Sequence, residues 1–301
     1  MARYINTDND CARFNEVYDK ILIKDQWINT NLLNTPRCIA FDGNFLYITN
    51  SEGNSIVKSA GLFTHFKPSS TEIVTWASTT NISILNKPWG IAIDGQDMYI
   101  ANSGDNSIIK ITNFRDSPIK ASKWNVPNLA LNGPREILIK NNDMYITNFY
   151  GNSITKIIDF RETTLRAETW TAASGLNRPY GMAFNGDVMF VSNSTGKFIT
   201  KIENNVSSVF LNSIDLENSD PYGIVISNNF LYIVIGSSIM CFDFNKNSIS
   251  TYIGSTNINV SLYSPIGVYI FDKSLFITNS GSTIISRIIN LPNPVSITGT
   301  V

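Results

Sequence analysis

Six copies of one motif run through the chain, and this internal repeat restricts the fold more than any other feature of the sequence. Each copy starts at a proline and continues through two short hydrophobic runs; the second copy reads KPWGIAIDGQDMYIANSGDNSIIKI. The prolines are Pro36, Pro88, Pro134, Pro179, Pro221 and Pro265, separated by 52, 46, 45, 42 and 44 residues. A period of this size indicates an array in which each repeat is one supersecondary unit that packs on its neighbours.

Each copy predicts four β-strands. In the second copy, β-branched runs at 90–93, 98–101 and 107–111 are separated by Asp, Asn and Gly turn residues. A fourth run in the spacer carries an aromatic residue, which is Trp76, Trp124, Trp170, Phe210 or Tyr252. Four antiparallel strands form one propeller blade. The sequence therefore predicts an all-β fold, a six-bladed β-propeller of four-stranded antiparallel blades that forms a single domain over residues 1–301.

The N-terminal segment is predicted to close the ring. Only 36 residues follow Pro265, too few for a complete sixth blade, whereas Trp27 lies nine residues before Pro36, as Trp170 lies nine before Pro179. We expect residues 1–35 to add the outer strand to the last blade, which removes the open sheet edge between the two ends of the ring. The last eight residues are then a tail or an additional edge strand.

The repeat resembles the NHL type of propeller repeat. That family's pattern is Pro-x-Gly-[Ile/Val]-Ala, a short turn, [Leu/Val]-Tyr-[Ile/Val]-Ala-[Asp/Asn] and Gly-Asn-x-[Ile/Val], and the likeness covers essentially the whole chain. The Trp-Asp dipeptide of WD40 repeats and the Gly-Gly doublet of kelch repeats are absent from the sequence. NHL-like propellers include binding scaffolds, lactonases and lyases, so the resemblance implies a fold and no single activity. The chain departs from the pattern at Cys38 and Glu136, which replace its glycine, and at Val234-Ile235, where other copies place Asn.

Charge and composition narrow the classes of partner. The chain has 23 Lys and Arg against 24 Asp and Glu, a net charge of −1, so counterion release offers little drive toward DNA, RNA or an anionic membrane. We expect no nucleic-acid and no membrane partner. No secretory signal is recognisable near the N-terminus, and Cys11, Cys38 and Cys241 are widely spaced, which predicts an intracellular, cytoplasmic protein with reduced thiols. The preference for Asn and Ile over Ala is typical of an AT-rich genome, as in giant DNA viruses, so a virion-associated location is a further hypothesis.

The residue that follows each repeat proline is the strongest candidate for a binding site. This position enters the innermost strand at the mouth of the central channel, and around the ring it is occupied by Arg37, Trp89, Arg135, Tyr180, Tyr222 and Ile266. Aromatic rings there can stack on a sugar or an aromatic side chain, and guanidinium groups can hold a carboxylate or phosphate. With Glu136 beside Arg135, these residues form the predicted ligand site. The alternative is that Arg135 pairs with Glu136 while the aromatic residues only cap the channel. The neighbouring loops would add Glu52, Asp105, Phe149, Tyr150 and Thr195.

Other repeated polar residues are predicted to be structural. We expect the Asn that ends the second strand to stabilise a turn; its copies are Asn50, Asn102, Asn148, Asn193 and Asn279. Asp42, Asp94 and Asp272 are likewise assigned to turns at the opposite face. The loops 113–116 and 159–162 are expected to be solvated.

Catalysis has less support in the sequence. The lyase relatives implied by the resemblance use His and Glu in the channel, but His65, the single His, lies in a spacer expected at the outer edge. Lactonase-like relatives hold a divalent cation, for which Glu136 with Asn148 or Asn193 would be a start, although another inward carboxylate is needed. We therefore expect a non-catalytic interaction module for a peptide, glycan or protein, with no cofactor and no metal. A metal-dependent lactonase-like hydrolase or lyase near Glu136 is the alternative, and a structural component of a larger particle is a third hypothesis.

Overall fold

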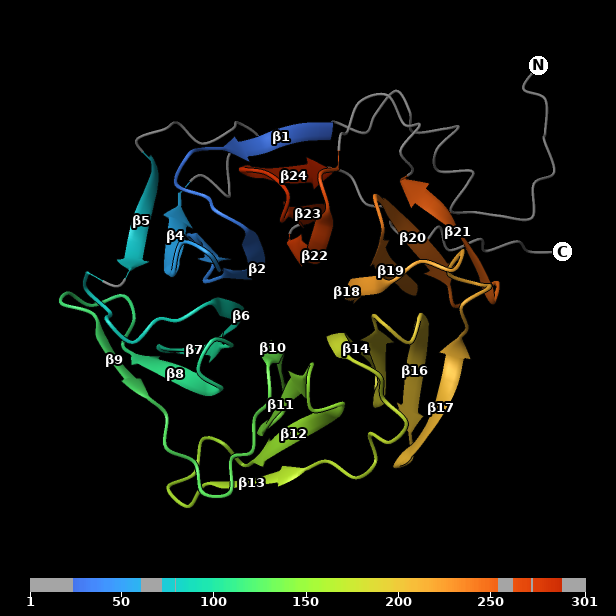
Figure 1. Ribbon diagram of the computed structural model, residues 1–301, viewed down its shortest axis with the longest axis horizontal. Coiled ribbons are helices and arrows are strands. Elements are labelled where there is room, and N and C mark those ends of the chain that lie inside the picture. The colour runs from blue at the N-terminus through green and yellow to red at the C-terminus, as the bar shows by residue number, and fades with distance from the viewer. Residues whose placement is uncertain (1–23, 61–71, 79, 254–261, 272, 289–301) are drawn as a thin grey trace, which may run out of the picture.

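The structure is a computed structural model that describes residues 24–60, 72–78, 80–253, 262–271 and 273–288. Its strands form six antiparallel four-stranded sheets arranged in a ring around a central axis (Figure 1). The sequence prediction of a six-bladed propeller is confirmed. Cys11, His65, Asp272 and the last eight residues lie outside the described residues. No helix among the described residues is long and apolar enough to cross a membrane.

Strands at equivalent positions of the six sheets repeat along the chain. The innermost strands are β2 (Pro36–Phe41), β6 (Pro88–Asp94), β10 (Pro134–Lys140), β14 (Pro179–Asn185), β18 (Pro221–Ser227) and β22 (Pro265–Phe271). The second strands are β3 (Leu46–Asn50), β7 (Asp97–Asn102), β11 (Asp143–Asn148), β15 (Val188–Asn193), β19 (Phe230–Ile235) and β23 (Ser274–Asn279). The third strands are β4 (Ser55–Ser59), β8 (Ser107–Thr112), β12 (Ser153–Ile158), β16 (Phe198–Glu203), β20 (Ser238–Asp243) and β24 (Ile284–Ile288). The outer strands are β5 (Ile73–Ser78), β9 (Lys120–Lys123), β13 (Arg166–Thr169), β17 (Val206–Leu211), β21 (Ser248–Ile253) and β1 (Lys24–Asn29). We number the blades 1 to 6 by their innermost strands, so β2 belongs to blade 1 and β22 to blade 6.

The ring closes as the sequence predicts. The strand order of blade 6 is β1-β24-β23-β22, so the first described strand is the outer strand of the last blade. Figure 1 shows β1 lying along β24 at the rim. Trp27 is buried here and meets Phe276 edge-on at 5.1 Å between ring centroids. This contact joins the two ends of the described chain inside one hydrophobic core.

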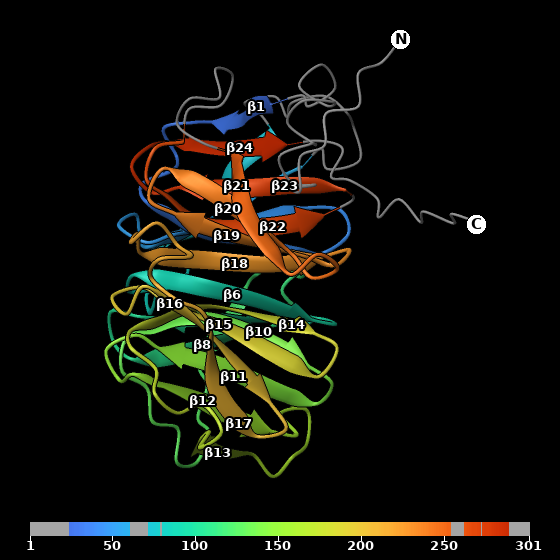
Figure 2. The same ribbon diagram turned by 90° about the vertical axis from the view of Figure 1, so that its right-hand side faces the viewer.

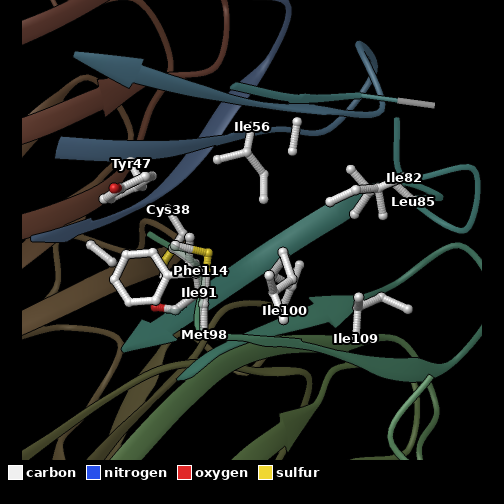
Figure 3. Packing of buried hydrophobic residues seen from close by; sticks show 13 residues of the cluster. Cys38, Tyr47, Ile56, Ile82, Leu85, Ile91, Met98, Ile100, Ile109 and Phe114 are labelled. Atoms are coloured by element: carbon white, nitrogen blue, oxygen red, sulfur yellow. Dashed lines mark hydrogen bonds between the residues drawn. The ribbon is translucent and has the colours of Figure 1, made fainter. Parts of the chain in front are cut away.

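The blades twist from the centre outward, as right-handed strand twist requires. Figure 2 shows β21, the outer strand of blade 5, running steeply across the direction of its innermost strand β18. The apolar faces of neighbouring blades pack against each other. Figure 3 shows one such contact between blades 1 and 2, where Cys38, Ile91, Met98 and Phe114 pack together.

The spacer aromatics pack on the second strand of their own blade. Trp76, Trp124 and Trp170 are partly buried and lie 5.1, 4.9 and 5.1 Å from the rings of Tyr47, Tyr99 and Tyr145. Phe210 and Tyr252 make the corresponding contacts with Phe190 and Tyr232 at 4.9 and 5.3 Å. The spacer aromatics therefore pack against the hydrophobic core at a position that repeats from blade to blade.

The prediction that loops 113–116 and 159–162 are solvated is wrong for their aromatic residues. Phe114 and Phe160 are buried, because each fills the gap between its own blade and the preceding one. The arginines that follow reach the turn of the preceding blade. Arg161 forms a two-pronged ion pair with Asp94, with nitrogen-to-oxygen distances of 2.6 and 2.8 Å. These loops therefore tie consecutive blades together.

The repeated Asn residues are structural, and they bond both to their own turn, where Asn102 donates to Asp105 at 2.7 Å, and to the loop that precedes their blade. The side-chain oxygen of Asn102 accepts a 2.8 Å bond from the backbone N–H of Asn86, sixteen residues earlier. Its amide nitrogen donates to the carbonyl of Ile84. The same sixteen-residue bond recurs in four other blades, at Asn50, Asn148, Asn193 and Asn279. Each Asn thus anchors the loop that leads into the innermost strand of its blade.

A hydroxyl group near the end of the second strand joins adjacent innermost strands. The Thr147 hydroxyl accepts a 2.9 Å bond from the N–H of Glu136 and donates a 2.9 Å bond to the carbonyl of Tyr180 in the next blade. Thr49, Ser192 and Thr278 make equivalent bonds in their blades. These bonds fix the backbone of residues at the channel mouth.

Replacing Thr147 with Val is expected to lower the free energy of unfolding by about 1–3 kcal/mol, because a buried N–H and a buried carbonyl lose their shared partner. Urea denaturation measures the change. Thr75→Val is the matched control, since Thr75 is exposed on β5 and its substitution is expected to change stability by less than about 0.5 kcal/mol. Equal losses in the two variants would contradict the proposed bridge between blades.

Candidate functional site

The structure brings together five of the six side chains predicted at the channel mouth. The innermost strands start at the same end of the ring, since the side chains that follow their first residues contact one another from blade to blade. The side chains come from blades 1 to 5, and we call them the mouth cluster; its members are Arg37, Trp89, Arg135, Tyr180 and Tyr222. Ile266 of blade 6 is buried.

The indole of Trp89 lies between two guanidinium groups. The ζ carbon of Arg37 is 4.0 Å from the ring centroid, and that of Arg135 is 3.4 Å from it. Two groups so close to one centroid would overlap if they shared a face, so they cover opposite faces of the indole. Contacts of this kind are favourable because the ring face carries negative charge density. Both faces of Trp89 are therefore occupied by the protein's own side chains.

A hydrogen bond crosses the channel from blade 2 to blade 4. The indole N–H of Trp89 donates to the phenolic oxygen of Tyr180 at 3.0 Å. Tyr180 is buried, and this burial is the main cause that raises its pKa above the usual value, so the phenol stays protonated. Tyr222 meets Tyr180 edge-on at 5.4 Å. The aromatic members of the cluster are thus held in one arrangement.

The positive charge of the mouth cluster has no acidic partner among the described residues. Arg135 is 7% exposed and donates a 3.0 Å bond to the hydroxyl of Ser103, while the Nε–H groups of Arg37 and Arg135 have no hydrogen-bond acceptor in the described part of the chain. Burial lowers the pKa of Arg135, and the nearby Arg37 lowers it further. Two cations are thus held together with no acidic residue of the described chain to balance their charge.

Acidic residues of the same face bond elsewhere. Glu52 pairs with Lys87 at 3.5 Å, and Asp105 pairs with Lys123 at 2.6 Å. The pairing of Arg135 with Glu136, which the sequence left open as an alternative, does not form. The physical reason is that successive side chains of a strand point to opposite sides.

Glu136 follows Arg135 on β10, so it lies one residue further along the innermost strand than the mouth cluster. It stands where four other blades have glycine, and those glycines allow close approach of neighbouring strands; a Cβ added to Gly90 would lie 2.3 Å from the carbonyl oxygen of Arg135. Glu136 is close enough to Cys38 and Tyr269 for its charge to raise their pKa values. Burial raises its own pKa to about 8, so this half-buried carboxyl is mostly protonated at neutral pH.

The metal-ligand set suggested by the lactonase resemblance is not assembled. The side-chain oxygens of Asn148 and Asn193 accept backbone bonds from Asn132 and Asn177, and their amide nitrogens donate to hydroxyl groups. No group of three or more His, Cys, Asp or Glu that could hold a metal ion occurs among the described residues. These Asn side chains are committed to loop anchoring, a role that repeats around the ring.

One residue near the mouth was not predicted from the sequence. Arg178 precedes the proline that starts β14, has a φ of 52°, and places its guanidinium carbon 5.3 Å from the ring of Phe149. Because Arg178 lies in a loop, the strand pattern of the sequence does not predict this contact. A sign in the sequence is that Phe149 and Tyr150 replace the Ser-Gly and Ser-Glu pairs found at this turn in other copies.

Comparisons with known proteins support the fold and leave the activity open. No family model and no curated protein matches the chain. Among solved structures, a virginiamycin B lyase from Staphylococcus aureus with quinupristin is 20% identical with a TM-score of 0.61, covering 91% of this chain and 89% of the lyase. A luciferin-regenerating enzyme is 11% identical with a TM-score of 0.63, covering 90% and 95% of the two chains. A chain of a nidogen/laminin complex is 13% identical with a TM-score of 0.60, covering 78% and 85%.

The three likenesses extend over 78% to 91% of this chain and therefore concern the propeller as a whole. At these identities they establish the fold alone, and they include both enzymes and a protein-binding complex. The NHL likeness of the repeats therefore stays a resemblance. Any statement of function has to come from the site.

Proposed function

We propose that this chain is a non-catalytic binding module whose mouth cluster captures a negatively charged group on a peptide or protein partner. The observation that carries the proposal is the pair of arginines that enclose Trp89 without an acidic partner among the described residues. Such a pair lacks the compensation that buried charges normally receive. A bound carboxylate or phosphate supplies it.

The geometry of the arginines favours an anionic ligand. Both guanidinium groups lie over the indole, their Nε–H groups are buried, and one terminal nitrogen of Arg135 donates to Ser103, so the remaining terminal N–H groups are the donors left for a ligand. Hydrogen bonds between charged groups are worth about 1.5–3 kcal/mol each. Because stacking has already ordered these side chains, less conformational entropy is lost when a ligand binds.

A peptide or protein partner is favoured over a glycan. A sugar bound by stacking needs an open aromatic face. Both faces of Trp89 are covered by arginines, so stacking a sugar there requires that one guanidinium be displaced. An acidic side chain needs no such rearrangement.

The proposal is tested with a fluorescein-labelled peptide that carries two glutamates separated by serine, and with a matched peptide that carries glutamines. In fluorescence anisotropy titrations, the Arg37→Met and Arg135→Met double variant is expected to bind the glutamate peptide about 100-fold more weakly than wild type, since two charge-assisted bonds are lost. Methionine keeps an unbranched chain over the indole, so the melting temperature is expected to stay within about 3 °C of wild type.

The matched control is the Lys87→Met and Lys123→Met double variant, which removes the same net charge from residues paired with Glu52 and Asp105. It is expected to lose no more than about threefold in affinity. Equal losses in the two double variants, or equal affinity of wild type for the glutamate and glutamine peptides, would overturn the proposed site.

A further inference from the structure

A second group of arginine–aromatic contacts lies next to the mouth cluster and shares Arg135 with it. Arg135 lies 4.7 Å from the ring of Phe149, and Arg178 lies 5.3 Å from the same ring. Tyr150 is within reach of both, at 5.6 and 5.9 Å. Guanidinium groups and rings thus alternate from blade 1 to blade 4; we call this the arginine ladder, formed by Arg37, Trp89, Arg135, Phe149, Tyr150 and Arg178.

We propose that the arginine ladder is a linear site for an extended acidic peptide in which acidic residues alternate with other residues, one carboxylate meeting each of the three arginines. This inference rests on the proposed function and adds to it the class of partner, the length of the site and the role of Arg178.

The outer step of the ladder is held in place by the fold. Tyr150 is 57% exposed, yet its ring lies directly against the backbone of Gly133. A Cβ added to Gly133, which has a φ of 63°, would lie 2.4 Å from the Tyr150 ring. The Tyr150 N–H donates to the carbonyl of Asn132, and the Arg178 N–H donates to the side chain of Asn152 at 2.7 Å. The exposed aromatic is therefore part of an ordered surface.

The spacing of the arginines fits an extended chain. Because Arg37 and Arg135 lie on opposite faces of one indole, their ζ carbons are separated by no more than the sum of 4.0 and 3.4 Å. In an extended strand, side chains of alternate residues point the same way and repeat at roughly 7 Å. The ζ carbons of Arg135 and Arg178 are separated by no more than the sum of 4.7 and 5.3 Å, their distances from the centroid of the Phe149 ring. Glutamates at alternate positions, with flexible side chains, can meet all three.

The charge of the ladder favours an acidic peptide over a nucleic acid. None of the three arginines has an acidic partner within 4.0 Å among the described residues, so this strip carries three positive charges on a chain whose net charge is −1. Single-stranded nucleic acids bind proteins by stacking bases on open aromatic faces. The rings of the ladder already carry guanidinium groups, and Phe149 also meets Tyr150 and Tyr180 edge-on. The arginine N–H groups that make no bond within the protein remain as hydrogen-bond donors for the carboxylates of a ligand.

The test compares two labelled peptides, one with three glutamates alternating with serines and one with only two. Wild type is expected to bind the three-glutamate peptide about 10-fold more tightly, one charge-assisted bond being worth about 1.4 kcal/mol or more. Arg178→Met is expected to remove this increment and to leave the two-glutamate affinity unchanged. Arg166→Met is the control, because Arg166 is an exposed arginine on the outer strand β13, away from the ladder.

The outcomes separate this inference from the proposed function. If the double variant at Arg37 and Arg135 loses the two-glutamate peptide while Arg178→Met does not affect the three-glutamate peptide, the ladder is wrong and the mouth site stands. If neither variant affects binding, both fail. If a labelled oligodeoxythymidine binds more tightly than the three-glutamate peptide and Arg178→Met abolishes that binding, the partner class is wrong.

Discussion

Replacing Trp27 with alanine is expected to lower the free energy of unfolding by about 3–5 kcal/mol, the largest loss we predict for a single substitution. Trp27 is 1% exposed, meets Phe276 edge-on at 5.1 Å and is packed in the core that joins β1 to blade 6 and blade 1. Removing it leaves a large cavity at the seam of the ring. Equilibrium urea denaturation, followed by circular dichroism, measures the change.

Trp124→Ala is the matched control, because Trp124 occupies the equivalent repeat position in blade 2. Trp124 is only partly buried and packs on Tyr99 within a blade formed by one continuous stretch of chain. We expect its loss to be smaller than that of Trp27→Ala by at least about 1 kcal/mol. An equal or greater loss at Trp124 would contradict the special role of the seam.

The second large effect is a dependence of stability on pH that arises from Glu136. Burial raises the pKa of its carboxyl from 4.5 to about 8. Between these two values the folded protein keeps a proton that the unfolded chain has released, so stability falls as the pH rises. The contribution is complete below pH 4.5, declines by up to about 1.4 kcal/mol per pH unit, and is lost once the pH passes about 8.

Glu136→Gln removes this titration while keeping the size of the side chain. The stability of wild type minus that of the variant, from urea denaturation at pH 5, 6, 7 and 8, is expected to decrease steadily and to total a few kcal/mol over this range. Other ionisable groups affect both proteins equally and cancel in the difference. A difference that stays constant from pH 5 to 8 would show that the carboxyl titrates normally.

Much of the fold follows from the sequence because each blade is a local unit. The six repeat prolines are the first residues of the six innermost strands. Their spacing therefore locates the blades, and the position of Trp27 relative to Pro36 is sufficient to predict the closing strand. Contacts between neighbouring blades, by contrast, cannot be predicted from the pattern of a single repeat. Phe114 and Phe160 look like loop residues within their own repeat and become core residues only when the preceding sheet is placed beside them.

The candidate site was predicted in part. Placing one residue from each blade at the channel mouth identified Arg37, Trp89, Arg135, Tyr180 and Tyr222, because this step needs only the direction of the innermost strands. The sandwich of Trp89 depends on the approach of side chains from three blades, which the sequence does not specify. Arg178 was missed because the residue before a strand is a loop position, and its left-handed backbone decides where the side chain goes.

The fold itself leaves the activity undecided, since the similar structures include a lyase as well as a nidogen/laminin complex. In this chain the channel contains a mostly protonated Glu136 beneath a mouth that is closed by Trp89 and its two arginines. The half-buried Arg37 and the exposed Arg178 bring positive charge to the surface around this mouth. This distribution of charge is what assigns the mouth to ligand capture in our account.

The most direct test of the account is a crystal structure of the protein with the three-glutamate peptide bound. We expect one carboxylate within hydrogen-bond distance of the Arg37 guanidinium and another within hydrogen-bond distance of the Arg135 guanidinium, with the indole of Trp89 still between them. A peptide bound elsewhere on the propeller, with both guanidinium groups free of contact, would contradict the assignment of the channel mouth as the binding site.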